Sequence, residues 1–238
     1  PVIDPTFRPA LLALALLAAA PVVAAAEETR IGAAALVEHD VRRADGPKGP
    51  IGSGDPIFRD EIVETGAGAA ARFVFADDTN LAMGPSSRVV LDRFVFDDSR
   101  TWAKAGVGLA KGAFRFTTGH SPKEAYEIRT GTATIGVRGT QLSIAASASS
   151  TTVTLEEGAA RVCGLGGGGR CTELTHPGDT VIVTAQGNRT GARPFSFPQT
   201  VCSKSPDACT VSFVDRRSDN GGGDNGSGGF PEIGRAHV

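Results

Sequence analysis

The segment GVRGT is the strongest candidate for binding chemistry in this sequence, because it places an arginine between two apolar runs of β type. Its residues are Gly136, Val137, Arg138, Gly139 and Thr140. Flanking glycines are suited to a β-bulge or tight corner, where the backbone needs a positive φ or approaches another segment closely. The five guanidinium donors of Arg138 are able to bind carbonyls or a carboxylate of neighbouring loops. We therefore predict that Arg138 is a structural clamp, and the alternative is that it binds an anionic ligand or a partner.

Other reactive residue types form no recognisable catalytic set. The serine-rich segments GPSSR and ASASST lack the Gly-x-Ser-x-Gly nucleophile elbow. Three pairs of acidic residues lie beside turn residues, where we expect carboxylates to cap turns or to face water. They are Asp77 with Asp78, Asp97 with Asp98, and Glu156 with Glu157. The sequence predicts a protein that is not an enzyme and has no cofactor.

The histidines and the glycine-rich segment also point away from a metal or phosphate site. His39, His120 and His176 stand alone, without His-x-x-x-His or Cys-x-x-Cys spacing. The run GLGGGGR (164–170) is not followed by the Lys-Ser/Thr of a phosphate-binding loop. We expect no metal, and we interpret the glycine run as the tip of a hairpin.

The four cysteines predict two disulfide bonds of local type. Four cysteines admit three pairings. Pairing Cys163 with Cys171 joins the two arms of the glycine hairpin, and pairing Cys202 with Cys209 closes the turn-like SKSPDA. Each loop is short, so each bond should add about 2–3 kcal/mol to stability in the chain-entropy view.

Both ends of the chain differ in composition from the middle. Residues 9–26 are apolar, follow Arg8 and end in Ala-x-Ala before the polar EETR, which is typical of a secretory signal peptide cleaved after Ala26. Pro21 and the many alanines argue against a membrane anchor, so we expect a periplasmic protein with no stable membrane insertion after cleavage. Residues 220–238 read as a glycine-rich disordered tail, of which 232–238, EIGRAHV, match a translated sequencing adapter and are expected to be an artefact.

The charge balance argues against nucleic acid as a partner. The 24 basic and 26 acidic residues give a net charge of −2, and the basic residues are scattered. A nucleic-acid-binding protein needs a dense basic face that displaces counterions.

Hydrophobic periodicity predicts β-structure almost throughout. In ARFVFADDTNLAMG, Phe73 and Phe75 alternate along one strand, a turn follows at Asp77, and the pattern resumes in a second strand, which indicates a hairpin. Similar short runs, separated by turn residues, continue to residue 185, and no sustained 3.6-residue period appears after the signal peptide. The fold class expected is all-β, a sandwich, barrel or short solenoid.

Several motifs in order resemble those of a FecR-type domain. The first half is GSGDPIFRDEIVETGAGAAARFVFADDTNLAMGPSSRVVLD, and the second comprises GAFRFTTG, YEIRTGTATIGVRGTQLSI and VTLEEGAARV. The segment that contains GVRGT is the best single mark of the resemblance, which covers roughly residues 51–185. Asp78 and Gly131 depart from the family pattern, but both occupy turn positions.

The resemblance implies an extracytoplasmic, all-β module without enzymatic activity. We expect a FecR-like domain over residues 27–190, built as a single β-sandwich or short solenoid. The cysteines after it predict a disulfide-bearing tail over 191–219. The implied role is interaction or scaffolding with an unknown periplasmic or envelope protein, linked to envelope signalling. Two alternatives remain: a carbohydrate or peptidoglycan binder, for which Trp102 and Tyr126 are the available aromatics beyond the phenylalanines of the core pattern, and a regulator of an extracytoplasmic-function sigma factor, which needs a cytoplasmic domain upstream.

Overall fold

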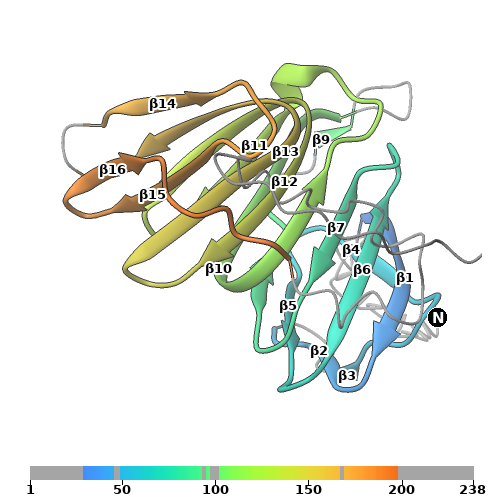
Figure 1. Ribbon diagram of the computed structural model, residues 1–238. Coiled ribbons are helices and arrows are strands. Elements are labelled where there is room, and N and C mark those ends of the chain that lie inside the picture. Colours follow the sequence, from blue (N-terminus) through green and yellow to red (C-terminus); the bar gives the residue numbers. More distant parts are fainter. Residues whose placement is uncertain (1–28, 46–48, 93–94, 97–101, 167–168, 198–238) are drawn as a thin grey trace, which may run out of the picture.

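The structure of the protein, a computed structural model, describes residues 29–45, 49–92, 95–96, 102–166 and 169–197 (Figure 1). Most of these residues lie in β-strands, which confirms the prediction of an all-β fold. Among them, no helix is long and apolar enough to cross a membrane. The elements are β1 (Arg30–Glu38), β2 (Val41–Arg43), β3 (Gly49–Pro50), β4 (Pro56–Phe58), β5 (Ile62–Thr65), β6 (Ala70–Phe75), β7 (Asn80–Met83), β8 (Arg88–Val90), β9 (Val95–Phe96), β10 (Trp102–Thr117), the 3-10 helix η1 (Lys123–Ala125), β11 (Tyr126–Thr130), β12 (Ala133–Ala146), β13 (Ser150–Gly164), β14 (Cys171–Leu174), β15 (Thr180–Thr184) and β16 (Gly187–Thr190).

Alternating apolar residues place the strands as the sequence predicts. Strands β6 and β7 form the expected antiparallel hairpin, with Phe73 opposite Leu81. Both side chains are fully buried, and Asp78 at the turn has a φ of 65°. The left-handed conformation that a turn glycine usually supplies is therefore adopted here by an aspartate, which tolerates it better than most residues.

The strands join into one continuous hydrogen-bonded sheet. Its main path runs β16-β15-β13-β12-β11-β10-β7-β6-β1-β4, and the remaining described strands pair with members of this path or with one another. Figure 1 shows two lobes, with β1 to β8 in one and β11 to β16 in the other. Strand β10 belongs to both, because it pairs with β7 and β8 on one side and with β11 and β12 on the other.

The three longest strands change partners along their length. Strand β12 pairs with β11 through residues 134–136 and with β10 through residues 141–146. Strand β13 pairs with β15 through residues 150–154 and with β14 through residues 160–163. Each long strand contains one glycine with a positive φ, namely Gly112 in β10, Gly139 in β12 and Gly158 in β13. These strands bend, and the bends let one sheet enclose a core.

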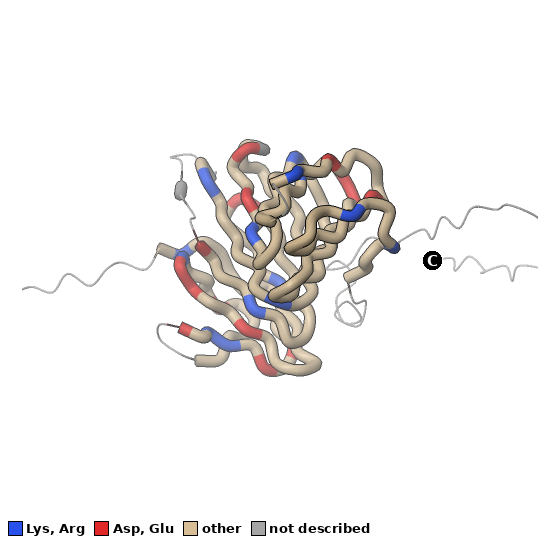
Figure 2. The backbone as a smooth tube through the Cα atoms, turned by 90° about the vertical axis from the view of Figure 1, so that its left-hand side faces the viewer, with Lys and Arg blue, Asp and Glu red and all other residues tan. Residues whose placement is uncertain are grey.

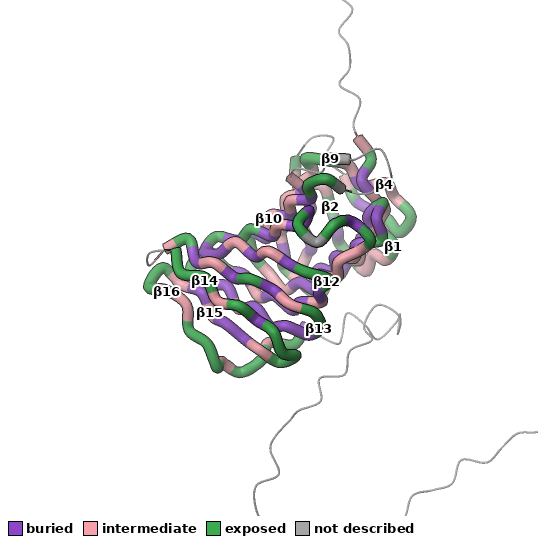
Figure 3. Tube along the Cα trace, turned by 90° about the horizontal axis from the view of Figure 1, so that it is seen from above, coloured by how far each residue is buried: buried purple, intermediate pink, exposed green. Residues whose placement is uncertain are grey.

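The two faces of the sheet differ. Seen from above, strands such as β12, β13 and β15 alternate between buried and more exposed residues (Figure 3). The buried face forms one large apolar cluster that spans both lobes. A second, small cluster contains Ala70, Ala82 and Phe197, with Ala113 packed against it. Because Phe197 follows the last strand, the packed domain continues past residue 190, the boundary expected from the sequence.

Candidate functional site

The segment GVRGT lies in β12 and crosses a β-bulge. Val137 and Thr140 are buried, whereas Arg138 and Gly139 are exposed. The expected buried clamp is therefore wrong, since no ion pair or hydrogen bond joins the guanidinium of Arg138 to another described residue. The reason is the strand alternation itself: Ile135 and Val137 point into the core, so Arg138 points outward.

Thr140 makes the connections that we predicted for the arginine. Its hydroxyl accepts a hydrogen bond from the backbone N–H of Arg138 (2.8 Å) and donates one to the carbonyl of Ala159 (2.7 Å). Its own N–H donates to the hydroxyl of Thr118 at 2.9 Å. A threonine directly after the bulge glycine was the available sequence signal, because short hydroxyl side chains commonly satisfy irregular backbone.

Gly139 and Gly158 allow β12 and β13 to touch at the bulge. Their φ angles are 59° and 81°. A Cβ on Gly158 would lie 2.0 Å from the carbonyl oxygen of Gly139, so no larger residue fits there without a backbone shift. The prediction that a glycine supplies a positive φ and a close backbone approach is confirmed for Gly139, which contacts Gly158 in the neighbouring strand. A Cβ on Gly136 would meet nothing within 4 Å, so the close approach expected at that glycine is absent.

Cys163 and Cys171 form the predicted disulfide bond. They lie opposite each other in the antiparallel pair β13–β14, with their Cα atoms 3.9 Å apart. The bond holds the short edge strand β14 against β13. Cys202 and Cys209 lie outside the described residues, and their pairing stays a prediction.

Asp77 is the centre of a buried hydrogen-bonded cluster. Its carboxylate accepts bonds from the N–H of Thr79 (3.0 Å), the hydroxyl of Thr79 (3.0 Å), the hydroxyl of Ser121 (2.7 Å) and the hydroxyl of Tyr126. Burial alone would raise the pKa of Asp77, but these bonds outweigh burial and the pKa is lowered. The turn-capping role expected of Asp77 is confirmed, and the cluster also ties the β6–β7 hairpin to the segment before β11.

Tyr126 is committed to this cluster and is not an exposed platform. It is 4% exposed, and both burial and its bond to Asp77 raise the pKa of its hydroxyl. Its ring packs edge-on against Phe116, with the ring centroids 6.0 Å apart. Trp102 begins β10, but its side chain lies outside the described residues. Tyr126 is therefore unavailable for stacking on a sugar.

Glu156 contradicts the expectation that this acid pair caps a turn or faces water. It lies inside β13 with its side chain fully buried, 3.2 Å from the guanidinium of Arg115, which is 7% exposed. The hydroxyl of Ser143 donates to the same carboxylate oxygen. A buried charge needs a charged or hydrogen-bonding partner, and that partner comes from β10, far away in the sequence. The other pair, Asp97 with Asp98, lies outside the described residues.

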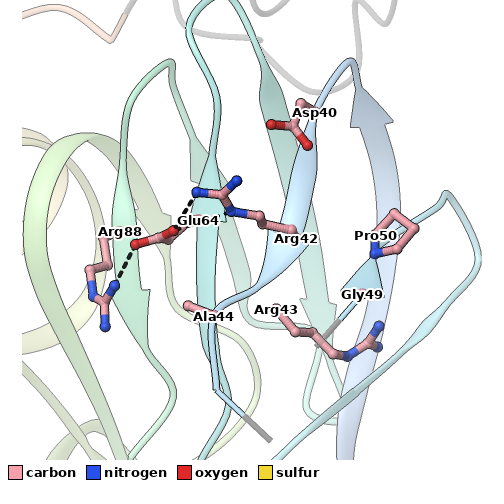
Figure 4. A pocket seen from close by; sticks show the side chains of 8 residues that line it. All are labelled: Asp40, Arg42, Arg43, Ala44, Gly49, Pro50, Glu64 and Arg88. Atoms are coloured by element: carbon pink, nitrogen blue, oxygen red, sulfur yellow. Dashed lines mark hydrogen bonds and ion pairs between the residues drawn. The ribbon is translucent and has the colours of Figure 1, made fainter. Parts of the chain in front are cut away.

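A polar cavity opens in the lobe formed by the first strands (Figure 4). It measures about 600 Å³ and is lined by Asp40, Arg42, Arg43, Ala44, Gly49, Pro50, Glu64 and Arg88. Glu64 lies between two guanidinium groups, bonded to that of Arg88 and 3.1 Å from that of Arg42. The bonds from Arg88 and Arg42 lower the pKa of Glu64. Arg43 is bound to Glu61 at 2.7 Å. These charges compensate one another, and the described residues of the lining include no serine, cysteine, lysine or histidine.

The histidines and the charge distribution define no further site. His120 lies 3.1 Å from Asp78 and His176 lies 3.6 Å from Asp179, all at the surface. No group of three or more His, Cys, Asp or Glu side chains suited to a metal occurs in the part of the chain that the structure describes. In the tube of Figure 2, the positions of Lys and Arg are interspersed with those of Asp and Glu.

Comparison with known proteins identifies the family of the central segment. Residues 61–161 match the family model described as FecR protein. Two crystal structures of a protein proposed to be an anti-sigma factor, from Parabacteroides distasonis ATCC 8503, are similar at 15% sequence identity, with TM-scores of 0.44 and 0.45. Each match covers 58% of this chain and 61% of the other, so this chain spans less than two thirds of those proteins. A search of curated proteins finds no match.

The matched residues run from the start of β5 into β13 and include the bulge with GVRGT. This part of the protein is a FecR-type domain. The match agrees with the resemblance carried by the sequence motifs of this segment.

Proposed function

We propose that the protein is an exported interaction module of bacterial envelope signalling, which binds a periplasmic or envelope protein and catalyses no reaction. The FecR-type domain at residues 61–161 supports this role. The signal-peptide pattern of residues 1–26 supports export.

The observation that carries the proposal is the exposed Arg138 in the segment most typical of the family. Thr140 and the glycine contact fix the backbone beneath it. The guanidinium itself points to solvent, without a charged partner among the described residues. A cation held outward on a rigid frame is suited to an acidic group of another protein, because little flexibility is lost on binding.

Four buried polar side chains of the described residues are occupied by contacts with one another. Asp77 and Tyr126 bind each other within a buried cluster. Glu156 and Arg115 form a buried pair. This arrangement supports a binding role, since each of these groups already has a structural partner.

The experiment is partner capture from periplasmic extract with the chain that starts at Glu27, compared among the parent, Arg138→Glu and Arg161→Glu. Arg161 is the matched control, because it is an exposed arginine of β13 that is paired with Glu173 at 3.1 Å. We expect the parent and Arg161→Glu to capture the same protein and Arg138→Glu to lose it, with all three melting alike. Equal capture by all three would refute a role for Arg138. Export is tested separately with the chain that keeps residues 1–26, and its retention in the cytoplasm would refute export.

A further inference from the structure

A row of residues crosses the sheet on the face opposite the large core. In register order the row contains Ala82 of β7, Arg115 of β10, Ser143 of β12, Thr154 of β13 and Thr180 of β15. Their neighbours along each strand point into the core, so the row lies on the other face. All five are nevertheless buried, which means that something covers them.

Residues 192–197, ARPFSF, cross this row and are called the strap. In Figure 1 the strap is the orange segment that follows β16 and passes over the strands towards the junction of the two lobes. The N–H of Phe195 donates to the hydroxyl of Thr154 at 2.9 Å, and the N–H of Phe197 donates to the hydroxyl of Ser143 at 3.3 Å. Thr154 and Ser143 are direct register partners, so the strap runs across the strands instead of along them.

Phe197 is 1% exposed, and the residues that surround its ring are called the Phe197 pocket. The ring packs against Ala70 and Ala82, and its centroid lies 5.8 Å from the guanidinium carbon of Arg115. Nε of Arg115 and Oε2 of its ion-pair partner Glu156 are buried and have no hydrogen-bond partner among the described residues. Small apolar side chains and a guanidinium group around the ring suit a flat aromatic side chain at this position.

The contacts between the strap and the sheet resemble those of a bound peptide and differ from those of a paired strand. Only Phe197 is buried, Ala192 and Phe195 are half-buried, and the other strap residues are exposed. Its two backbone bonds go to side-chain hydroxyls. Within the described residues, no backbone-to-backbone hydrogen bond joins the strap to the sheet. Such a segment can leave while every strand pairing of the sheet remains intact.

We propose that this groove binds an extended segment of a partner protein, with an aromatic side chain in the Phe197 pocket, and that the strap is an internal occupant that the partner displaces. The strap shows the pattern required: an aromatic residue in the pocket, a second aromatic two positions before it, and N–H groups at both positions facing hydroxyls. The identity of the occupant as a partner protein rests on the proposed function, but the groove itself does not.

The test uses a fluorescent peptide, ARPFSF with blocked ends, and the full chain with Phe197→Ala. Removal of the anchor empties the pocket, so we expect this variant to bind the peptide about tenfold more tightly than the parent, whose groove is occupied. Fluorescence anisotropy measures the two affinities. Arg193→Ala, at an exposed strap position, is the control variant and should bind as weakly as the parent, and the peptide ARPFSA should bind none of the three proteins.

Equal binding of ARPFSF by Phe197→Ala and the parent, with the variant still folded by circular dichroism, would overturn the proposal. If that variant does not fold, hydrogen exchange of the parent decides. Excess ARPFSF, but not ARPFSA, should speed exchange at the amides of Phe195 and Phe197, and unchanged exchange would overturn the proposal. Dimers of the parent that Phe197→Ala abolishes would assign the groove to a second copy and refute a partner segment. If Phe197→Ala binds the peptide but the capture experiment yields no protein, the proposed function is refuted, whereas the groove is still shown to bind an extended segment.

Discussion

Thr140→Val should destabilise the domain far more than Arg138→Ala, although the arginine is the larger residue. Valine has nearly the shape of threonine, so the substitution removes a hydroxyl and leaves the packing in place. Two hydrogen bonds are lost, the one accepted from Arg138 N–H at 2.8 Å and the one donated to the Ala159 carbonyl at 2.7 Å. Thr140 is 3% exposed, so water cannot easily replace the lost partner.

The expected cost follows from these two bonds. Each is worth about 1 kcal/mol net, and a buried carbonyl left without a donor adds roughly 1 kcal/mol more. The sum is about 2–3 kcal/mol, which lowers the melting temperature of a domain of this size by about 5–10 °C. Arg138→Ala removes an exposed side chain whose guanidinium has no partner among the described residues, and its cost should stay within about 0.5 kcal/mol.

The assay is urea unfolding followed by circular dichroism, with the parent and both variants measured side by side. The slope of free energy against urea should be the same for all three proteins, because the surface exposed on unfolding hardly changes. A loss in Arg138→Ala as large as that in Thr140→Val would refute this reasoning. It would show that the arginine supports the fold after all.

Three further results are expected. Gly158→Ala should cost about 3 kcal/mol or more, because its Cβ would lie 2.0 Å from a carbonyl oxygen, whereas Gly68→Ala, with a positive φ but open space, should cost only about 1 kcal/mol; thermal melts compare the two. Mass mapping without reduction should find Cys163 linked to Cys171, and replacing both cysteines with serine should cost about 2–3 kcal/mol in urea unfolding. The lowered pKa of Asp77 means that its stabilisation is present above its ordinary pKa and is lost as the pH falls through the lower folded-state pKa. The stability gap between the parent and Asp77→Asn should therefore narrow below about pH 4, and a gap that is constant down to pH 2 in urea titrations would contradict this assignment.

Strand positions could be predicted because alternation is a local property. Phe73, Leu81 and Phe114 each fall in short alternating runs, and each is fully buried. The same alternation also contained the answer for Arg138. Ile135 and Val137 were assigned to the core, so the next residue had to face outward. The clamp prediction relied on the hydrogen-bonding capacity of the guanidinium. The position of Arg138 in the strand, directly after a core residue, would have predicted its exposure correctly.

Contacts between distant segments could not be predicted in this way. Glu156 looks like a surface residue beside Glu157, and only the pairing of β13 with β12, and of β12 with β10, brings Arg115 within reach. Phe197 lies in a proline-containing segment without alternation, a pattern that predicts a tail outside the packed domain. Its pocket is assembled from β6, β7 and β10, none of which is near it in sequence.

The ion pair of Arg115 and Glu156 connects the groove under the strap with the bends of the three long strands. Strands β10 and β13 are not neighbours, because β12 lies between them. The pair spans β12 and includes it through the hydroxyl of Ser143, so three strands are held in one register from the face opposite the core. A buried pair of this kind gives little net stability over an apolar pair, but breaking it leaves an uncompensated charge, which penalises any other register. The three strands bend at glycines only a few residues away, where backbone pairing alone would fix the register least. The polar pair lies on the outer face beside these bends. The ring of Phe197 lies 5.8 Å from the guanidinium carbon of Arg115 and, as an aromatic hydrocarbon, does not compete for the hydrogen bonds of the pair.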